Sequence, residues 1–452
     1  MESKNIWMEK NRRRLLFGAI TFLLIIPLLF VDFFGENFIP FNPWMEESSS
    51  STIEEQKPLK SLLARLVTGK DRRKLQTSGF ACDIAENSIV CLSNQPVRID
   101  TRNNITIYDS SNEEESSVKP YALQKDKYLL QFISPVKILH RNSNPPVCQY
   151  NHEIPAVIFS SGISGNLFHE FNDIIIPLFL TTKHFQSRVL VILEDYSPTF
   201  VIKFSKILSR LSDYEVMNPS ANQTVHCFPG SILGLKYHDN LALNPKNIPE
   251  GYTIRDFQKF LFEAYNLKYT HVSQIRKKPT MMLISREKTR KFLNQDEMVA
   301  MIRRLGFHVI IATTKVASNL TSFASVVNSC NVLVGAHGAG LTNEMFLPAG
   351  AVLVQVEPIG MEWASAHYYG DPARTMGLHY LRYKIEPEES SLSEVYGLNN
   401  SVITDPESIY AMGYREVKAV YLDQQDLRIN IVRFRETLLH ALQLVRKASS
   451  SG

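Results

Sequence analysis

The residues best suited to chemistry in this chain gather in two short segments. One spans residues 335–344 and has the sequence Gly-Ala-His-Gly-Ala-Gly-Leu-Thr-Asn-Glu. It joins two runs rich in Val and Leu, 331–334 and 351–356, of the kind that form buried parallel strands. Glycines let a backbone approach a ligand closely, and the first N–H groups of a following helix attract anions. The segment therefore predicts a site for an anion such as a diphosphate.

Side chains in and near this loop fit the same kind of ligand. His337 offers a donor to phosphate oxygens, and Glu344 offers an acceptor to ribose hydroxyls. Arg286 follows the apolar run 280–285, where its guanidinium is placed to reach a diphosphate. A tight strand-to-helix turn with a core histidine is the alternative, and the shared presence of His, Glu and three glycines favours the binding site. An exposed basic loop explains the next cations equally well: Lys288, Arg290 and Lys291.

The second segment, residues 166–173, has the sequence Asn-Leu-Phe-His-Glu-Phe-Asn-Asp. On an α-helix, four of its polar residues fall at i, i+3, i+4 and i+7 and share one face: Asn166, His169, Glu170 and Asp173. The apolar run 156–159 predicts a strand just before it, so this face begins where α/β proteins bind ligands. An imidazole and carboxylates there can serve as a general base. A solvated helix face is the alternative, although Lys, Arg and Gln are scarce on it.

Several other site types are incompatible with these residues. The zinc motif His-Glu-x-x-His is incomplete, because Asp173 stands in place of the second histidine. The turn 162–165 does not match the Gly-x-Ser-x-Gly elbow of serine hydrolases. The sequence contains no Asp-x-Asp triplet, the usual source of oxygen ligands for a divalent ion on a diphosphate. We expect no metal and no other cofactor, with basic residues supplying the positive charge.

Strand, turn and helix alternate from residue 156 onward, with a break at 276–279. The pattern predicts an α/β protein with two Rossmann-like domains, 79–275 and 276–448, facing a cleft. The expected strands are 156–159, 188–193, 280–285, 307–311, 332–334 and 351–356. The expected helices are 166–179, 199–211, 254–266, 296–305, 341–346 and 424–447.

The N-terminus predicts the compartment. Basic residues 10–14 precede an apolar stretch and acidic residues follow it, so we expect a cytosolic tail (1–14) and a transmembrane signal anchor (15–34). Residues 35–78, with prolines, serines and mixed charges, predict a stem. The net charge of +4 is too small, and too concentrated near the N-terminus, to indicate nucleic-acid binding.

Cysteines and glycosylation sequons agree with a lumenal location. The five cysteines predict one or two disulfides and one free thiol, and Cys82 and Cys91 are close enough in sequence to pair. The sequons that predict N-glycosylation lie at Asn104, Asn222, Asn319 and Asn399.

Longer motifs connect these features to a known family. They comprise residues 159–182 (FSSGISGNLFHEFNDIIIPLFLTT), 225–229, 283–286, 329–358 (SCNVLVGAHGAGLTNEMFLPAGAVLVQVEP) and 371–380. With these motifs the chain resembles the plant branch of glycosyltransferase family 61, over roughly residues 79–448. The resemblance implies a single-pass type II protein of the Golgi membrane whose catalytic part is lumenal and has the two-domain GT-B architecture.

The resemblance also implies an activity. It predicts an inverting, metal-independent enzyme that transfers arabinofuranose or xylose from a UDP-sugar to xylan during cell-wall biosynthesis. A β-1,2-xylosyltransferase or another sugar transferase acting on N-glycans is the first alternative. A catalytically inactive Golgi scaffold of the same fold is the second, and the retained imidazole, carboxylates and arginine weigh against it.

Inverting transfer needs a base for the acceptor hydroxyl and positive groups for the departing diphosphate. We expect the base among His169, Glu170 and Asp173, with either His169 held by Asp173 or Glu170 in that role. The residues expected around the UDP-sugar are Arg286, Gly335, His337, Gly338, Gly340, Asn343 and Glu344. For Trp363 and Tyr368, burial in the core is favoured over a sugar platform.

Overall fold

The computed structural model of the 452-residue chain describes residues 58–450, apart from 86, 142–143, 163, 222, 239, 242, 249, 314, 316 and 318. The expected cytosolic tail, the signal anchor, stem residues 35–57 and the sequon at Asn222 lie outside the described residues. Within the part that the structure describes, no helix is long and apolar enough to cross a membrane. The described residues belong to one compact unit.

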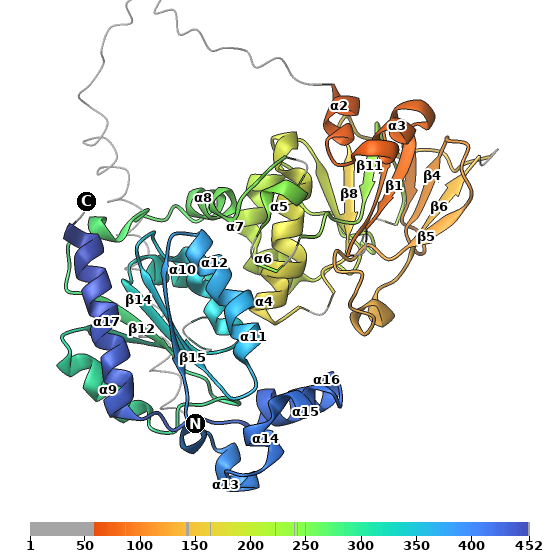
Figure 1. Ribbon diagram of the computed structural model, residues 1–452. Coiled ribbons are helices and arrows are strands. Elements are labelled where there is room, and N and C mark those ends of the chain that lie inside the picture. The colour runs from red at the N-terminus through yellow and green to blue at the C-terminus, as the bar shows by residue number, and fades with distance from the viewer. Residues whose placement is uncertain are drawn as a thin grey trace, which may run out of the picture. The chain divides into compact units, whose positions relative to one another are not determined.

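The first half of this unit contains two sheets (Figure 1). The first has the strand order β1-β2-β11-β8-β9, in which β11, β8 and β9 are parallel while β1 and β2 are antiparallel. Its strands are β1 (Phe80–Ile84), β2 (Ile89–Ser93), β8 (Ala156–Phe159), β9 (Leu190–Leu193) and β11 (Ser231–Leu233). The predicted strands at 156–159 and 188–193 are confirmed, because continuous apolar runs favour burial on both faces.

The second sheet was not foreseen from the sequence. Its order is β5-β6-β4-β3-β10-β7, with both parallel and antiparallel pairs. Its strands are β3 (Val97–Asp100), β4 (Thr106–Asp109), β5 (Ser116–Val118), β6 (Val136–His140), β7 (Tyr150–Asn151) and β10 (Val225–Phe228). The alternating strand-and-helix pattern, expected from residue 156 onward, therefore describes only part of the domain at 79–275.

Two disulfides reinforce this half. Cys82 joins Cys91 across the β1–β2 pair, as the sequence predicts, and Cys148 joins Cys227 on β10. Cys330 is the buried free thiol among the described residues. The sequon asparagines Asn104, Asn319 and Asn399 are exposed, which leaves them accessible to modification.

The second half is built on one fully parallel sheet of order β13-β12-β14-β15-β16. The strands are β12 (Thr280–Ile284), β13 (His308–Ala312), β14 (Val332–Ala336), β15 (Val352–Glu357) and β16 (His379–Lys384). In this order the chain runs from β12 to β13 at one edge of the sheet, and then returns to form β14 on the other side of β12. The β12–β14 boundary is thus a topological switch point, where α/β folds bind ligands beyond the carboxyl ends of the strands.

Helices cover both faces of this sheet (Figure 1). On one face lie α9 (Gln295–Arg304) and α17 (Ile431–Ser450), and on the other α10 (Leu320–Asn328) and α12 (Asp371–Thr375). Short helices fill the chain between β16 and α17: α13 (Leu392–Tyr396), α14 (Ser401–Thr404), α15 (Pro406–Tyr410), α16 (Tyr414–Val417) and the π-helix η10 (Lys418–Gln424). The mixed α/β class predicted from the sequence is confirmed.

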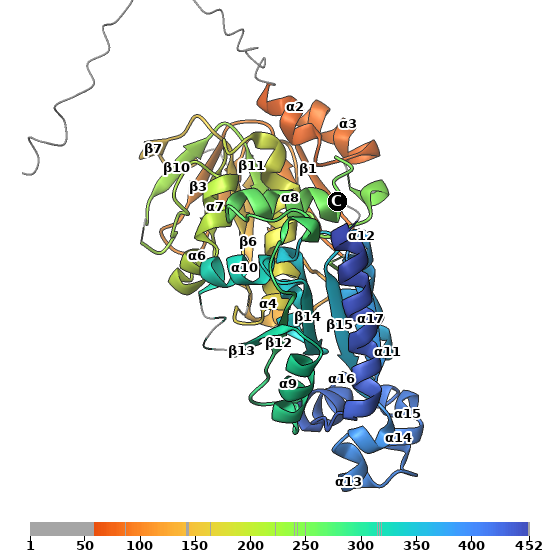
Figure 2. The same ribbon diagram turned by 90° about the vertical axis from the view of Figure 1, so that its left-hand side faces the viewer.

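The two halves share one apolar core. Phe171 from the first half has its ring centroid 6.0 Å from that of Phe346 in the second half and 6.2 Å from that of Phe257. Phe257 belongs to α8 (Ile254–Ala264), whose Gln258 donates through Nε2 to the carbonyl of Leu347 at 3.0 Å. Helices α4 (Leu167–His169), α8 and α10 are labelled in Figures 1 and 2. All three pack on the helix η7 (Ala339–Phe346).

The end of the predicted stem is wrong. Residues 59–78 form two helices, α2 (Leu59–Ala64) and α3 (Gly69–Ser78), instead of a tether. Leu63, Val67 and Leu75 have no exposed surface and join the main apolar core. Leu59, Leu62, Leu63, Leu66 and Val67 recur at helical spacing, so α2 had a usable signal in the sequence. Leu75 is the one large apolar residue of α3, so the packing of α3 had no such signal.

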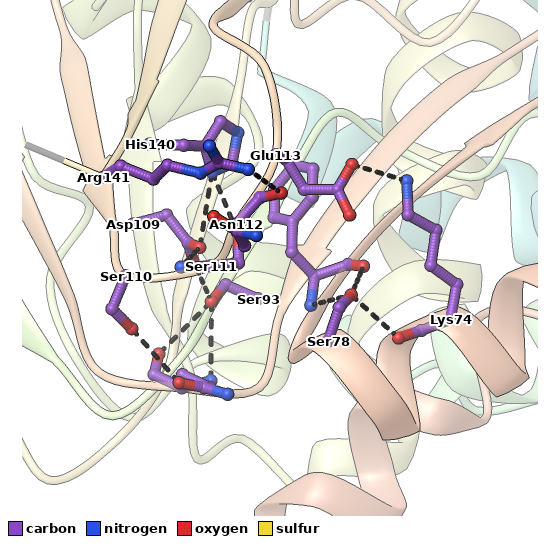
Figure 3. A network of polar contacts seen from close by, with 12 residues as sticks. Lys74, Ser78, Ser93, Asp109, Ser110, Ser111, Asn112, Glu113, His140 and Arg141 are labelled. Carbon is purple, nitrogen blue, oxygen red and sulfur yellow. Dashed lines mark hydrogen bonds and ion pairs between the residues drawn. The ribbon is translucent and has the colours of Figure 1, made fainter.

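Polar contacts also attach α3 to the sheets (Figure 3). Lys74 forms a 2.8 Å ion pair with Glu113, close to a buried network around Asp109 in which Ser111 Oγ lies 2.9 Å from His140 Nδ1. Asp109 accepts hydrogen bonds from the Ser93 hydroxyl and the Ser111 backbone. The folded unit accordingly includes α3.

Leu75→Ala tests whether α3 is part of the fold. Removing a fully buried leucine side chain should lower the free energy of unfolding by about 2–5 kcal/mol. The exposed neighbour Gln76 provides the matched control, and Gln76→Ala should change it by less than about 0.5 kcal/mol. Chemical denaturation of the fragment beginning at Pro58 measures both, and equal effects of the two substitutions would contradict the packing of α3.

Candidate active site

The helix that follows β8 carries the first group of candidate residues. It begins as α4, capped by the Asn166 side chain, which accepts from the Phe168 N–H. It continues as the π-helix η2 (Glu170–Ile175) and then as α5 (Ile176–Thr182). A π-turn has i→i+5 hydrogen bonds and rotates the following side chains relative to an α-helix. The expected single polar face is therefore wrong: Asn166 only caps the helix, and Glu170 has partners different from those of His169.

His169 and Asp173 form a pair. His169 Nδ1 lies 2.9 Å from Asp173 Oδ2, whose carboxylate is 1% exposed, while the His169 side chain is 44% exposed. Asp173 also accepts from the Tyr121 hydroxyl at 2.9 Å and from Asn172 Nδ2 at 2.7 Å. Because a carboxylate accepts hydrogen bonds, Nδ1 carries the ring proton and Nε2 keeps its lone pair. The arrangement is that of an oriented, solvent-accessible general base.

The pKa of His169 reflects this partner. Burial lowers the pKa, but the hydrogen bond and the negative charge of Asp173 outweigh it, so the pKa lies above its usual value. Asp126 adds a smaller effect in the same direction. When the histidine is neutral, a raised pKa makes it bind the proton of an acceptor hydroxyl more strongly.

Glu170 is placed differently. It is 2% exposed, forms an ion pair with Lys203 on α6 (Pro198–Lys203), and accepts from the Gly165 N–H at 3.1 Å. A buried carboxylate whose oxygens already bind a lysine and the turn is poorly placed to reach the hydroxyl of a substrate. Of the two arrangements expected for the base, the geometry favours His169 held by Asp173.

Tyr121 is a site residue that the sequence did not reveal. It lies 52 positions before Asp173, is 1% exposed, and stands against the turn at Gly162. Gly162 has φ +59°, and a Cβ there would come 2.8 Å from the Tyr121 ring. The glycine is needed both for the positive φ and for the close approach of the ring. Only the Gly-rich character of the turn hinted at such a contact.

The glycine loop after β14 contains two kinds of glycine. A Cβ at Gly335 or Gly340 would come within 3.2 Å or 2.8 Å, respectively, of the Ile284 side chain, so these two allow the loop to pack on β12. Gly338, with φ +144°, faces the arginines instead, and a Cβ there would lie 2.6 Å from Arg286 Nη1. Among the three glycines, Gly338 is the one beside the charged groups expected to bind phosphate.

Two arginines meet at this point. Arg286 follows β12 and donates to the carbonyl of Thr289 at 2.7 Å, and Arg290 donates to the carbonyl of His337 at 2.9 Å. Arg290 is 9% exposed and its Nε has no hydrogen-bond partner in the described part of the chain. Burial lowers the pKa of Arg286; burial and then the charge of Arg286 lower that of Arg290 to about 10. The exposed-loop interpretation holds for Lys288 and is wrong for Arg290.

His337 is buried and neutral. Its Nδ1 accepts from Gln355 Nε2 at 2.9 Å, and Gln355 Oε1 accepts from the Tyr380 hydroxyl, which fixes the amide orientation. Burial, then Arg290 and Arg286, lower the pKa of His337 to about 3. With Nδ1 as acceptor, Nε2 carries the proton and can donate to an anion without adding charge.

Buried oxygens without partners concentrate near the same loop. Both carboxylate oxygens of Glu344 and Glu357, and Oδ1 of Asn343, lack a hydrogen bond in the described part of the chain. Burial raises the pKa of Glu344 well above its usual value and that of Glu357 to about 7, the latter partly offset by Arg382 at 3.5 Å. Unsatisfied buried groups of this kind call for a ligand or a proton.

These placements modify the expected ribose contacts. Asn343 and Glu344 are 3% and 0% exposed, and neither side chain opens to the surface in this structure. Glu357, at the carboxyl end of β15, was missed by the sequence reasoning, although its place after an apolar strand was a usable signal. All three lie on the loops where a nucleotide is expected.

Aromatic rings connect the His169–Asp173 pair with the cluster that contains His337 and the two arginines. Phe168, next to His169, has its ring centroid 5.0 Å from that of Tyr368 and 5.9 Å from that of Tyr369. Tyr368 and Tyr369 in turn lie 6.4 Å and 5.4 Å from the His337 ring. The oriented base and the arginine cluster are thus parts of one site at the junction of the halves. Trp363 is 61% exposed, so its expected burial in the core is wrong.

Comparison with known proteins agrees with this arrangement. The family model for glycosyltransferase 61 matches residues 167–354, from the helix carrying His169 to β15. XYXT1, a beta-1,2-xylosyltransferase of Oryza sativa subsp. japonica, is 37% identical over 74% of each chain. The xylan glycosyltransferase MUCI21 of Arabidopsis thaliana is 34% identical over 72% of this chain and 70% of its own length. The chain belongs to glycosyltransferase family 61.

Other matches are less complete. The alpha-1,3-arabinosyltransferase XAT3 of Oryza sativa subsp. japonica is 37% identical over 74% of this chain, which spans only 59% of the length of that relative. The solved heptosyltransferase TibC is 10% identical with a TM-score of 0.31, covering 71% of this chain and 84% of its own, and carries no argument about the fold.

Asp173→Asn tests the pairing of His169. The substitution removes the negative charge that raises the pKa of His169, while burial still lowers it, so that pKa should fall below its present value. Histidine Cε1–H resonances followed by NMR against pH, with the His169 signal assigned from His169→Gln, give the pKa directly. An unchanged pKa in a folded Asp173→Asn protein would show that the pair does not form in solution.

Proposed function

We propose that this chain is an inverting glycosyltransferase that moves a pentose, arabinofuranose or xylose, from a UDP-sugar to xylan. The observation that carries the proposal is the ring contact of Phe168 with Tyr368 and Tyr369, because it unites the His169–Asp173 pair with the cluster around His337. A base on one side and an anion site on the other are the two requirements of direct displacement at an anomeric carbon.

The reaction assigns one role to each group. His169 Nε2 takes the proton of the acceptor hydroxyl as that oxygen bonds to the anomeric carbon from the face opposite the diphosphate. The bond from this carbon to the diphosphate oxygen breaks, its electron pair leaves with UDP, and the configuration inverts. Asp173 stabilises the imidazolium that forms, and Tyr121 and Asn172 hold Asp173 in place.

The donor side of the proposal uses positive charge from the protein. Arg286, Arg290 and the Nε2–H of His337 would contact the diphosphate, with Gly338 giving the backbone room beside them. Glu357, together with Asn343 and Glu344, stands where the unsatisfied oxygens would meet ribose hydroxyls. The fixed cations would stabilise the leaving diphosphate, so we propose that transfer needs no metal ion.

Relatives supply the substrate class. The printed names of MUCI21 and XYXT1 describe a xylan glycosyltransferase and a beta-1,2-xylosyltransferase, and XAT3 is an arabinosyltransferase. We therefore propose a UDP-pentose donor and a xylan acceptor, with the halves acting as the two domains of a GT-B enzyme. The basic and apolar N-terminal sequence supports a Golgi location, anchored through residues 15–34 with the catalytic part in the lumen.

Arg290→Ala tests the anion site. Loss of a charged hydrogen-bond donor should weaken UDP binding by about tenfold to a hundredfold, measured by calorimetry with EDTA present. The exposed Lys288, two positions away, is the matched control, and Lys288→Ala should bind UDP as the wild type does. Equal losses in both variants, or none in either, would contradict a diphosphate site at the buried arginines.

Transfer itself is tested with the fragment from Pro58, UDP-xylose or UDP-arabinofuranose, and xylo-oligosaccharides in the presence of EDTA. We expect transfer by the wild type, and a loss of about a hundredfold to ten-thousandfold in kcat for His169→Asn with UDP binding retained. Since the base must be neutral, kcat/KM should rise with pH through the raised pKa of His169.

The remaining outcomes are informative. Binding of UDP without transfer to xylan, but with transfer to N-glycans, would replace the acceptor in the proposal. A folded fragment that binds no UDP would overturn the enzyme and favour a scaffold of the same fold. Transfer that EDTA abolishes and a divalent ion restores would overturn metal independence alone.

A further inference from the structure

Trp363 occupies an unusual position for a large aromatic residue. It lies in α11 (Glu362–Ser365), which follows β15 and is labelled beside it in Figure 1. The side chain of Trp363 is 61% exposed. Burial of a tryptophan side chain removes about 150–250 Å² of surface from water. The exposed position of Trp363 therefore gives up a substantial hydrophobic contribution to stability. Its ring is nevertheless held, because its centroid lies 4.7 Å from that of His367 and 5.5 Å from that of Tyr368, the latter at an interplanar angle of 80°. A ring held in this way presents a fixed aromatic face at the surface, on which a ligand with an apolar side can stack.

The charged groups around the indole cancel one another. Asp371 pairs with His367 at 3.0 Å and with Arg374 at 3.1 Å, and Glu362 pairs with Lys384 at 3.3 Å. Paired charges leave no excess to attract a nucleotide or an ionised polymer. They still offer exposed donors and acceptors beside an apolar ring. This combination suits a ligand that is neutral, rich in hydroxyl groups and apolar on one face, which describes a neutral sugar residue.

The indole is connected to the proposed site through a series of rings. Tyr368, its neighbour, lies 5.0 Å from Phe168, and Phe168 lies 5.5 Å from the ring of His169. Tyr368 also lies beside His337 at 6.4 Å. Since Tyr368 and Phe168 stand between Trp363 and the base, a sugar stacked on Trp363 is not the sugar whose hydroxyl reacts at His169.

We propose that Trp363 forms an acceptor subsite, in which the indole stacks on a neutral sugar residue of the polysaccharide away from the residue that receives the pentose. The inference rests on the proposed function, because it places the reacting hydroxyl at His169. Its consequence is a preference for longer acceptors: a chain that reaches both His169 and Trp363 gains a contact that a short one lacks. The neighbouring residues Asp371 and Arg374 would bind hydroxyl groups at the edge of the ring.

Acceptor length provides the test. In the fragment from Pro58, Trp363→Ala should lower kcat/KM for xylohexaose about tenfold through KM, and change that for xylobiose by less than about twofold. Trp363→Phe keeps an aromatic face and should retain most of the preference for the longer chain. Tyr150→Ala is the matched control, since Tyr150 on β7 is 58% exposed and also stacks on a histidine, His226, with centroids 5.2 Å apart. It should leave both acceptors unaffected.

The outcomes separate this inference from the function on which it rests. If the wild type transfers pentose but Trp363→Ala affects both lengths equally, or neither, the subsite is overturned and the proposed function stands. If Tyr150→Ala matches Trp363→Ala, the effect is not local and the subsite is likewise overturned. If the wild type binds UDP and transfers to neither xylo-oligosaccharide, the proposed function fails and the subsite fails with it.

Discussion

The packing of one phenylalanine between the two halves is the interaction on which the site depends. Phe171 has no exposed surface and contacts rings from both halves, at 6.0 Å from Phe346 and 6.2 Å from Phe257. Truncating such a ring typically costs about 3–5 kcal/mol, so the helix bearing it is firmly attached to η7. His169 and Asp173 lie on that same helix. The distance between the base and the arginine cluster is therefore set by a shared core and not by flexible loops.

Glu170 and Asp173, both in the π-helix η2, have different partners. His169 and Asp173 keep the i,i+4 spacing at which side chains on a helix meet. Glu170, with which the π-helix begins, pairs with Lys203 instead. A carboxylate with its own cation does not disturb the pKa of the base. Single π-turns recur at functional sites for such reasons, because they change side-chain direction at small cost to the helix.

The sequence predicted mainly those features of the structure that are determined by residues close together in the chain. Apolar strands and a glycine loop are recognisable from a few neighbouring residues, and β12, β13, β14 and β15 of the second half were predicted from them. The edge strand β16, which lacks a continuous apolar run, was not predicted. The sequence left Arg290 open between an exposed loop and the site, because its burial depends on carbonyls of His337 and Gln425, 47 and 135 positions away. Helix α3 was missed for a similar reason, since its Leu75 packs into a core formed by distant residues and has no local pattern. Helix α2 had a local pattern, because Leu59, Leu62, Leu63, Leu66 and Val67 recur at helical spacing, and it was missed because the surrounding composition indicated a stem.

The charge arrangement at the switch point supports the proposed diphosphate ligand. Burial lowers the pKa of both Arg286 and Arg290, and no carboxylate of the described residues lies within 4.0 Å of either guanidinium. Two partly desolvated cations side by side oppose folding, and a dianionic ligand would offset both the desolvation and the repulsion. In the proposed function, donor binding would therefore stabilise the fold, because the ligand compensates a charge that only the folded chain brings together.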